Sequence, residues 1–285
     1  MSFGYFLAFM QPTKELTDQR RLFQKSIGPR GVEEYDSFLI HGSSELLQGL
    51  DGFSGQPMDV LVKTLGNALT RIAYGEHFFQ HHGEEIIEKN VEALELLSWA
   101  VTKFWLVDLI PALRYIPAWF PGANFKHVGN KGKNCADTIR YWPIDRVNAA
   151  SSKGISDNSI LSKYRNEGGF SEESVRDAVA IMYIGGIDTT TATVTHFLFS
   201  ITLYSNWQKL IQEEMDQVLG RGTIPTIEDI PKLKIFNAVF KESLRWIPAA
   251  PIGLPHVSSK EDVWNGYYIP RGSIVHCNIG FVWKP

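Results

Sequence analysis

The sequence has few cysteines, no excess of basic residues and no long hydrophobic run free of charge. Its 285 residues include only two cysteines, Cys135 and Cys277, so it has neither a disulfide framework nor the paired Cys-x-x-Cys spacing of a structural zinc site. The 28 basic residues are outnumbered by 31 acidic residues, and both kinds are mixed along the chain. Nucleic acid is therefore not an expected partner, because a phosphate backbone is bound by a one-sided basic surface.

The longest weakly charged stretch covers residues 178–204, where Asp188 is the only formal charge. Its length would allow a membrane-spanning helix, but its centre, residues 188–196, is densely polar. An aspartate in the middle of a spanning helix costs about 2.5 to 3.5 kcal/mol on insertion scales. The apolar residues 1–10 are too few to span a bilayer. A packed helix is thus the favoured interpretation of residues 178–204.

The composition, 44% apolar and 12% aromatic, is sufficient for a sizeable folded core. Apolar residues recur at spacings of three and four over residues 60–72 and 86–105, which predicts packed helices there. Residues 126–169 are polar and rich in Gly, Ser, Lys and Asn, and we expect one helix around 136–150 between mobile loops.

A second set of helices is expected from Ser171 onward, because this N-cap residue is followed by two glutamates. The helical pattern continues to about Leu203. A helix over 207–219 should stop at Gly220 in a left-handed cap, and another over 232–246 is bounded by prolines on both sides.

Strand and turn signals follow Pro248. Asn265-Gly266 is a strong two-residue hairpin signal, and residues 270–272 form a turn before the β-branched residues at 274–275. The predicted fold is mainly α with a small β region. Three parts are expected: N-terminal helices and a polar connection (1–170), a long central helix with the helix after it (171–247), and the β region (248–285).

Gly185 and Gly186 interrupt the long predicted helix, and each costs about 1 kcal/mol relative to alanine. Two explanations fit: a ligand approaches the helix at this gap, or a neighbouring helix packs closely through small residues. Asp188 and Thr189 place an acid and a hydroxyl beside the gap, and the Thr189 hydroxyl can reach the carbonyl of Gly185 one turn back. The first explanation predicts a groove with polar walls.

Glu242 and Arg245 lie three residues apart on one face of the later helix. Such pairs are usually exposed and contribute about 0.3 to 0.5 kcal/mol. Here apolar neighbours surround the pair, which predicts partial burial and a bidentate, orienting contact.

These pieces, in this order, resemble the cytochrome P450 family of haem-thiolate monooxygenases. GGIDTT at 185–190 is similar to the oxygen-activating motif of the family's central helix, and KESLRW at 241–246 is similar to its Glu-x-x-Arg helix. QRRLFQK at 19–25 resembles its third lettered helix, and WFPGANFK at 119–126 is similar to a region of fungal microsomal members. The resemblance covers nearly the whole chain and implies the family's helical fold in incomplete form.

The resemblance implies haem as cofactor, and dioxygen, a small organic substrate and an electron-donating reductase as partners. Gly185 and Gly186 would border the oxygen pocket, Asp188 and Thr189 would deliver protons to the bound oxygen, and Glu242 and Arg245 would be structural. Arg20 and His256 match positions that hold the haem propionates. The alternatives are that Arg20 is a solvated helix residue and that His256 is a structural histidine. The family location is the endoplasmic reticulum membrane. Two explanations fit residues 104–120: a buried core segment, which is the commoner case, or contact with a membrane surface, as in the similar region of microsomal members.

Two departures from the family pattern affect the expected activity. Leu16 stands where a tryptophan usually supplies one propionate contact. The iron-binding cysteine is not matched: Cys277, expected inside a strand, lacks the flanking arginine and glycine, and Cys135 precedes the central helix. No metal ligand is therefore assigned. The chain as given is expected to be inactive, and cytoplasmic if expressed without an anchor. A non-catalytic helical fragment and a membrane or scaffold protein remain alternatives.

Overall fold

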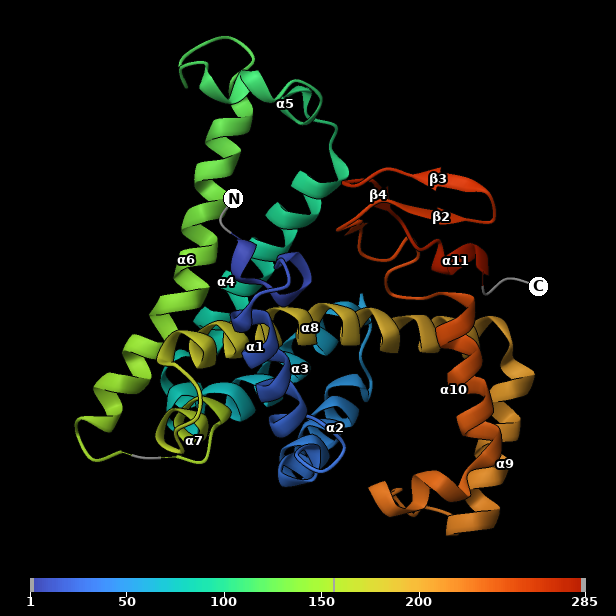
Figure 1. Ribbon diagram of the computed structural model, residues 1–285. Coiled ribbons are helices and arrows are strands. Elements are labelled where there is room, and N and C mark those ends of the chain that lie inside the picture. The colour runs from blue at the N-terminus through green and yellow to red at the C-terminus, as the bar shows by residue number, and fades with distance from the viewer. Residues whose placement is uncertain (1–2, 156, 283–285) are drawn as a thin grey trace. The chain divides into compact units, whose positions relative to one another are not determined.

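The computed structural model describes residues 3–155 and 157–282 of the chain (Figure 1). Most of these residues are helical, and the strands are short. The helices are η1 (Phe3–Tyr5), η2 (Leu7–Phe9), α1 (Lys14–Ser26), η3 (Val32–Tyr35), α2 (Asp36–Leu50), α3 (Pro57–Tyr74), α4 (Glu76–Thr102), α5 (Leu106–Leu109), η4 (Pro111–Tyr115), α6 (Asn124–Ser151), α7 (Ile160–Asn166), α8 (Glu172–Leu203), α9 (Ser205–Leu219), η5 (Ile227–Lys232), α10 (Lys234–Trp246) and α11 (Ile279–Val282). The strands are β1 (His256–Val257), β2 (Asp262–Trp264), β3 (Tyr267–Ile269) and β4 (Ile274–Val275).

The chain divides into two compact units, residues 1–188 and 189–285, with the boundary inside α8. Each unit is described by itself. None of the helices in the described part of the chain is long and apolar enough to cross a bilayer.

The core of the first unit forms around the first half of α8. Residues 178–184 of this half are apolar on all sides, as expected for a helix surrounded by other helices. Its Val179 and Tyr183 are fully buried and belong to one apolar cluster with residues of α3, α4, α6 and α7. The Tyr183 hydroxyl lies 3.0 Å from that of Thr70 in α3, which satisfies a buried polar group.

The apolar N-terminal residues are packed into a second cluster of the first unit. Tyr5 and Phe6 are buried beside Ala136 and Ile139 of α6. The Tyr5 hydroxyl donates to the carbonyl of Ala136 at 3.1 Å. This short run therefore serves as part of the core.

The polar region 126–169 is far more helical than expected. α6 extends from Asn124 to Ser151 and includes Pro143, and α7 follows at 160–166. The expectation of a short helix between mobile loops was wrong, because Ala136, Ile139 and Val147 supply a buried face at helical spacing while the polar residues face outward. α4 likewise begins ten residues before the predicted start at Ile86, at Glu76.

The predicted start of α8 is confirmed. The Ser171 hydroxyl accepts a hydrogen bond from the backbone N–H of Ser174 at 3.1 Å, and the helix ends at Leu203. α9 also ends at the predicted residue, but Gly220 has φ 90° and ψ 149°, an extended conformation with positive φ. The prediction of a left-handed helical cap was therefore wrong, because ψ of Gly220 lies outside the left-handed helical region. The positive φ still favours glycine at this position.

The small β region of the second unit contains the predicted hairpin. β2 and β3 pair antiparallel, with Trp264 opposite Tyr267. Asn265 and Gly266 between them have φ values of 51° and 82°, the pair of positive values that a type I′ turn requires. β1 pairs with β4, so that His256 lies opposite Val275. Because β4 ends at Val275, the expectation of Cys277 inside a strand was wrong.

Candidate functional site

An open cavity of about 780 Å³ lies in the first unit between α1, the residues that follow it, α3 and the first half of α8. Arg20, Gly185 and Gly186 all line it, so the fold brings together three of the residues that the sequence singled out. The rest of the lining is mainly apolar, with Phe23, Ile27, Val32, Leu39, Leu69, Ile72 and Met182 among its members. Such a lining suits a flat apolar ligand with a small number of polar groups.

Arg20 is the cationic residue of this lining. Its side chain is exposed, and no carboxylate of the described first unit forms an ion pair with it. The neighbouring Arg21 differs, because its Nη2 donates to the carbonyl of Gly169 at 2.6 Å and its guanidinium lies 4.6 Å from the centre of the Phe170 ring. Arg20 is thus available to a ligand carboxylate, whereas Arg21 is held by the protein itself.

The two glycines of α8 have different neighbours. A Cβ atom added to Gly185 would meet no atom within 4 Å, so the absent side chain leaves cavity space. A Cβ atom on Gly186 would lie 2.9 Å from Cδ1 of Leu69 in α3. Gly186 therefore allows close packing of two helices, and Gly185 borders open cavity space. The prediction of polar walls was wrong, because the cavity lining is mainly apolar and includes neither Asp188 nor Thr189.

Asp188 and Thr189 occupy consecutive exposed positions of α8. Asp188 ends the first unit and Thr189 begins the second. Within the polar block 188–196, residues 188–190 are exposed, Thr191 is buried and residues 192–196 are half-buried.

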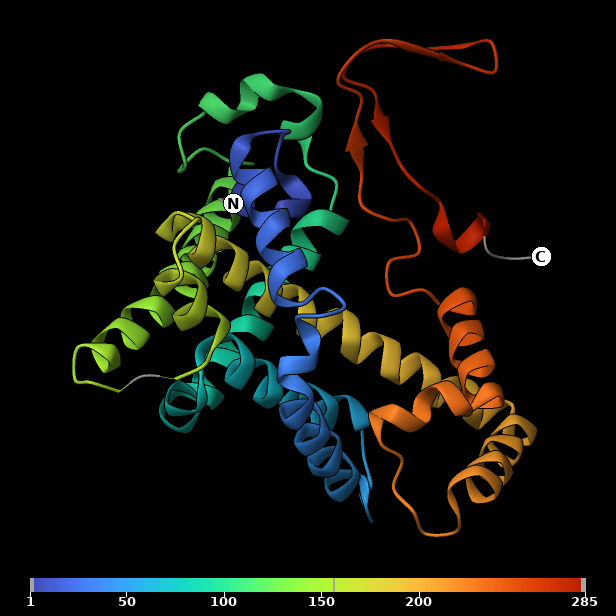
Figure 2. The ribbon, with the colours of Figure 1, turned by 60° about the horizontal axis from the view of Figure 1, so that its bottom comes forward.

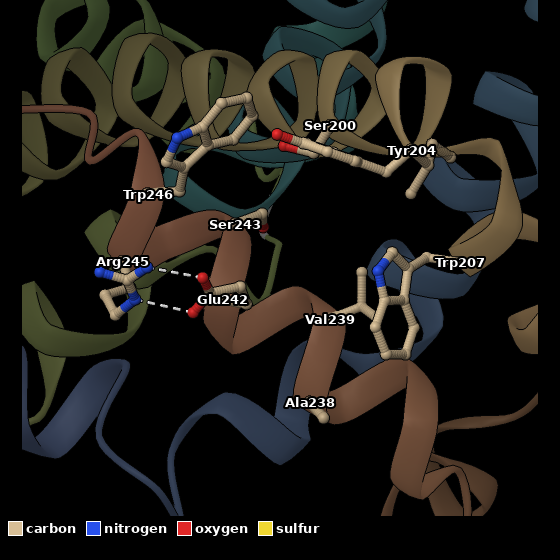
Figure 3. A pocket seen from close by; sticks show the side chains of 10 residues that line it. Ser200, Tyr204, Trp207, Ala238, Val239, Glu242, Ser243, Arg245 and Trp246 are labelled. Carbon is tan, nitrogen blue, oxygen red and sulfur yellow. Dashed lines mark hydrogen bonds and ion pairs between the residues drawn. The ribbon is translucent and has the colours of Figure 1, made fainter. Parts of the chain in front are cut away.

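Glu242 and Arg245 form a bidentate pair on α10 in the second unit (Figure 3). Arg245 Nε donates to Oε2 at 2.7 Å and Nη2 donates to Oε1 at 2.6 Å. The guanidinium lowers the pKa of Glu242, and the carboxylate raises the pKa of Arg245. Burial is unequal, because the Arg245 side chain is 29% exposed and that of Glu242 is 59% exposed, so partial burial was predicted correctly only for the arginine.

A pocket of about 840 Å³ lies beside this pair, between the end of α8, α9 and α10 (Figure 3). Its walls include Tyr204, Trp207 and Trp246. Two serines in the lining donate to carbonyls of their own helices, Ser200 to His196 at 2.6 Å and Ser243 to Phe240 at 2.8 Å. Apart from the ion pair, the lining is consequently mainly apolar. Sequence reasoning missed it, because its three helices are brought together only by the fold.

His256 lies on β1 of the second unit, where its side chain is exposed. Its Nδ1 is 3.1 Å from the carbonyl of Leu254, which can only accept, so Nδ1 carries the hydrogen. Donation from Nε2 to a carboxylate then requires the doubly protonated imidazolium.

The cysteines lie in different surroundings. Cys135 is half-buried on α6, where burial raises the pKa of its thiol. Cys277 is exposed in the coil after β4. Within residues 3–155 and 157–282, His, Cys, Asp and Glu side chains form no group of three that could hold a metal ion.

Comparison with known proteins identifies the family. The profile described as Cytochrome P450 matches residues 1–284. The chain belongs to the cytochrome P450 family. It is similar to a cytochrome P450 monooxygenase of Armillaria gallica, at 30% identity over 98% of this chain and 56% of that protein. It is also similar to the O-methylsterigmatocystin oxidoreductase of Aspergillus flavus, at 31% identity over 73% of this chain and 40% of that protein.

Solved P450 structures share the fold. A zebra fish cytochrome P450 with progesterone aligns at a TM-score of 0.77 and 20% identity, covering 98% of this chain and 65% of that one. The predicted mainly α, P450-like and incomplete fold is therefore confirmed. The chain spans about half the length of the curated P450 relatives it matches along nearly its whole length.

Proposed function

We propose that this chain provides the haem-facing wall of a monooxygenase that inserts one oxygen atom from dioxygen into a small organic substrate, with electrons from a reductase. The observation that carries the proposal is the meeting of Arg20 and Gly185 in one apolar cavity. Family membership supports the reaction type.

The residues of the cavity fit haem in both shape and charge. The open space at Gly185 and the apolar side chains suit a flat macrocycle, and Arg20 suits a propionate at its edge. Haem, when bound, supplies the iron centre at which dioxygen is activated. Arg20 would hold one propionate carboxylate. His256 of the second unit is proposed as a propionate ligand on the family resemblance alone.

Asp188 and Thr189 are the proposed proton carriers. Asp188 would exchange protons at its carboxylate oxygens, and Thr189 would hold a water or pass a proton at Oγ1. Glu242 and Arg245 have a structural role in this proposal, since the pair forms two hydrogen bonds within the last turns of α10.

These 285 residues are proposed to be inactive alone, because neither cysteine suits an axial ligand. The half-buried Cys135 thiol is disfavoured as a thiolate by its raised pKa. Cys277 has Val275 and Ile279 in place of the arginine and glycine of the family's loop. Thiolate ligation of the iron favours O–O cleavage. Without a thiolate ligand, Asp188 and Thr189 would have no reactive centre to which they could deliver protons.

The absorption spectrum of the chain with haem, after reduction and addition of carbon monoxide, tests this assignment against a Cys277→Ala variant. We expect both proteins to give the same spectrum without a thiolate-type band. A thiolate-type band that disappears in the variant would make Cys277 the ligand. If neither protein takes up haem and the chain is folded, the non-catalytic helical alternative gains support.

Contact with a membrane surface is a second proposal, favoured by one observation. The connection between α4 and α6 exposes large apolar side chains, with Trp119 80%, Phe104 75% and Leu109 68% exposed. Soluble surfaces rarely group so many exposed apolar residues. Location at the endoplasmic reticulum membrane is proposed on this basis and on the fungal relatives. Flotation of the chain with lipid vesicles tests it, and a chain that never floats would contradict it.

A further inference from the structure

Asn265, in the turn between β2 and β3, is the only asparagine of the chain that is followed by glycine. The amide carbon of an asparagine side chain can be attacked by the backbone nitrogen of the next residue. A following glycine leaves this nitrogen unhindered, because it has no side chain. The dipeptide that forms the hairpin turn therefore also has a chemical reactivity, which is expressed only where the structure leaves both reacting groups free.

The turn leaves both groups free. Asn265 and Gly266 are exposed. Among the described residues, neither the side chain of Asn265 nor the N–H of Gly266 takes part in a hydrogen bond. A Cβ atom added to Gly266 would meet no atom within 4 Å, so solvent reaches the backbone at this residue. Neither packing nor hydrogen bonding blocks an attack by the Gly266 nitrogen.

The hairpin can also open, which the attack requires because the Gly266 nitrogen must approach Cγ of Asn265. β2 and β3 have three residues each, and all of their side chains are exposed except the half-buried Ile269. A two-stranded hairpin without a packed face is only marginally stable. In Figure 1 and Figure 2 it extends beyond the paired strands β1 and β4, which hold its base. The turn can therefore open while the base stays paired.

Asn158 of the first unit provides the contrast. This residue is exposed and is followed by Ser159, whose side chain is small. The Ser159 N–H, however, donates to Oδ1 of Asp157 at 3.1 Å. Ser159 is the N-cap of α7 and is only 2% exposed. The backbone nitrogen after Asn158 is therefore held and shielded, whereas the one after Asn265 is not.

We propose that Asn265 is a site of spontaneous deamidation, with water as the only co-reactant. The Gly266 nitrogen loses its proton to hydroxide and forms a bond to Cγ of Asn265. The bond from Cγ to the side-chain nitrogen breaks, and ammonia leaves with a proton from water. Water then opens the resulting succinimide at either of its two carbonyls, which gives aspartate or isoaspartate at this position. No atom is oxidised or reduced.

The isoaspartate product changes the hairpin. It routes the main chain through Cβ and lengthens the backbone between Trp264 and Tyr267, which pair across the two-residue turn. A type I′ turn has room for two residues of ordinary backbone length, so the lengthened turn no longer fits. Both products add one negative charge. Deamidation of Asn265 therefore opens β2–β3 and makes the exposed tip more acidic.

Peptide mapping by mass spectrometry tests the proposal on the full chain, kept folded at mildly alkaline pH. We expect Asn265 to be converted first, into two products, at a rate proportional to the hydroxide concentration, while Asn158 stays intact. Urea should speed the reaction at Asn158 by more than about tenfold, because unfolding releases the Ser159 N–H, and the reaction at Asn265 by less than about threefold. Faster conversion of Asn158 than of Asn265 in the folded chain overturns the proposal.

Two matched variants check the source of the ammonia. Asn265→Gln should lose most of the ammonia release of the folded chain, because glutamine would have to form a larger ring. Asn158→Gln should leave the release unchanged. Equal ammonia release from Asn265→Gln and the unmodified chain overturns the proposal. An Asn265 that reacts only in urea overturns it as well, since the closed turn would then be protective.

Neither measurement depends on haem, so these outcomes are separate from those of the proposed function.

Discussion

Asp177 of α8 accepts two hydrogen bonds from Arg140 of α6, from Nε at 2.5 Å and from Nη2 at 2.6 Å. Arg176 Nε donates to the same carboxylate at 2.7 Å. All three side chains are mostly buried, and the Arg140 guanidinium lies 4.6 Å from the centre of the Tyr5 ring. One carboxylate thus joins the N-terminal residues, α6 and α8 within the first unit.

Replacing Asp177 with Asn should lower the free energy of unfolding by about 3 kcal/mol, because two buried guanidinium groups would lose their counter-charge. Urea unfolding of the full chain measures the change. Asp216→Asn is the control, since Asp216 pairs with Arg221 where the side chains are 47% and 92% exposed, and it should change stability by less than about 0.5 kcal/mol. Equal effects would contradict a structural role for the buried network.

Glu214 of α9 caps α10 from outside that helix. Its Oε1 accepts the N–H of Ile235 at 2.8 Å and its Oε2 accepts that of Phe236 at 3.0 Å. Burial acts to raise the pKa of Glu214, but the backbone N–H groups prevail and hold it below its usual value. The carboxylate form is therefore the one that the folded state prefers.

Glu214→Gln should cost about 1 kcal/mol near neutral pH, the usual contribution of a capping carboxylate. Because the folded pKa lies below the unfolded value, this contribution is present above the unfolded pKa of about 4.5 and is lost as the pH falls through the folded pKa. Thermal unfolding of the two proteins should differ at pH ~7 and converge toward pH ~3. Glu213→Gln, an exposed neighbour, should show no such convergence.

Gly75 joins α3 to α4 with φ of 95°, and a Cβ atom there would collide with Oδ2 of Asp157. Asp157 cannot move freely, because its Oδ1 accepts from the Ser159 N–H at 3.1 Å and the Ser162 hydroxyl at 3.0 Å. Gly75→Ala should therefore cost more than about 2 kcal/mol. Gly154 has φ of 80° and open space around it, so Gly154→Ala isolates the backbone strain and should cost about 1 kcal/mol. Urea unfolding measures the free energy of unfolding of both variants. Similar losses in Gly75→Ala and Gly154→Ala would show that the collision with Asp157 is absent.

The two cysteines should differ in reactivity. Burial raises the pKa of the Cys135 thiol and reduces its thiolate fraction, whereas Cys277 is exposed. Iodoacetamide at neutral pH should modify Cys277 first, and peptide mapping by mass spectrometry shows the order. Faster modification of Cys135 would mean that α6 opens readily from the first unit.

Local signals predicted the elements that are encoded locally. Ser171 with its following glutamates, the Asn265-Gly266 turn and the prolines around α10 each act on adjacent residues, so the sequence alone was sufficient. α6 was underestimated, because its buried face is diluted by polar residues and depends on packing partners from other elements. The same limit applies to the second-unit pocket and the Arg140–Asp177 pair, whose partners are distant in sequence.

The candidate site was predicted residue by residue from the resemblance, but its geometry was not. The sequence left open whether Gly185 and Gly186 admit a ligand or a helix, and only the fold separates the two roles. That Arg20 lines the same cavity as Gly185 follows from the packing of α1 near α8, which no spacing along the chain encodes.

Arg20→Gln should weaken haem binding about tenfold through loss of a charge-assisted bond, while Arg30→Gln, at an exposed arginine outside the cavity, should not. Asp188→Asn and Thr189→Ala should leave haem affinity unchanged, because their proposed task is proton transfer. A haem titration followed by absorbance measures the haem affinity of all four variants. Weaker binding in the Asp188 or Thr189 variants alone would assign them a holding role instead.

The most direct test of the central claim, that the cavity at Gly185 receives haem, is a haem titration of Gly185→Leu against Gly129→Leu. Both glycines lie in helices, and a Cβ atom on either would meet no atom within 4 Å, so the substitutions are matched except for the cavity. We predict that Gly185→Leu lowers haem affinity by about tenfold or more and that Gly129→Leu leaves it unchanged. Equal affinity in the two variants, with both proteins folded, would contradict the assignment of this cavity.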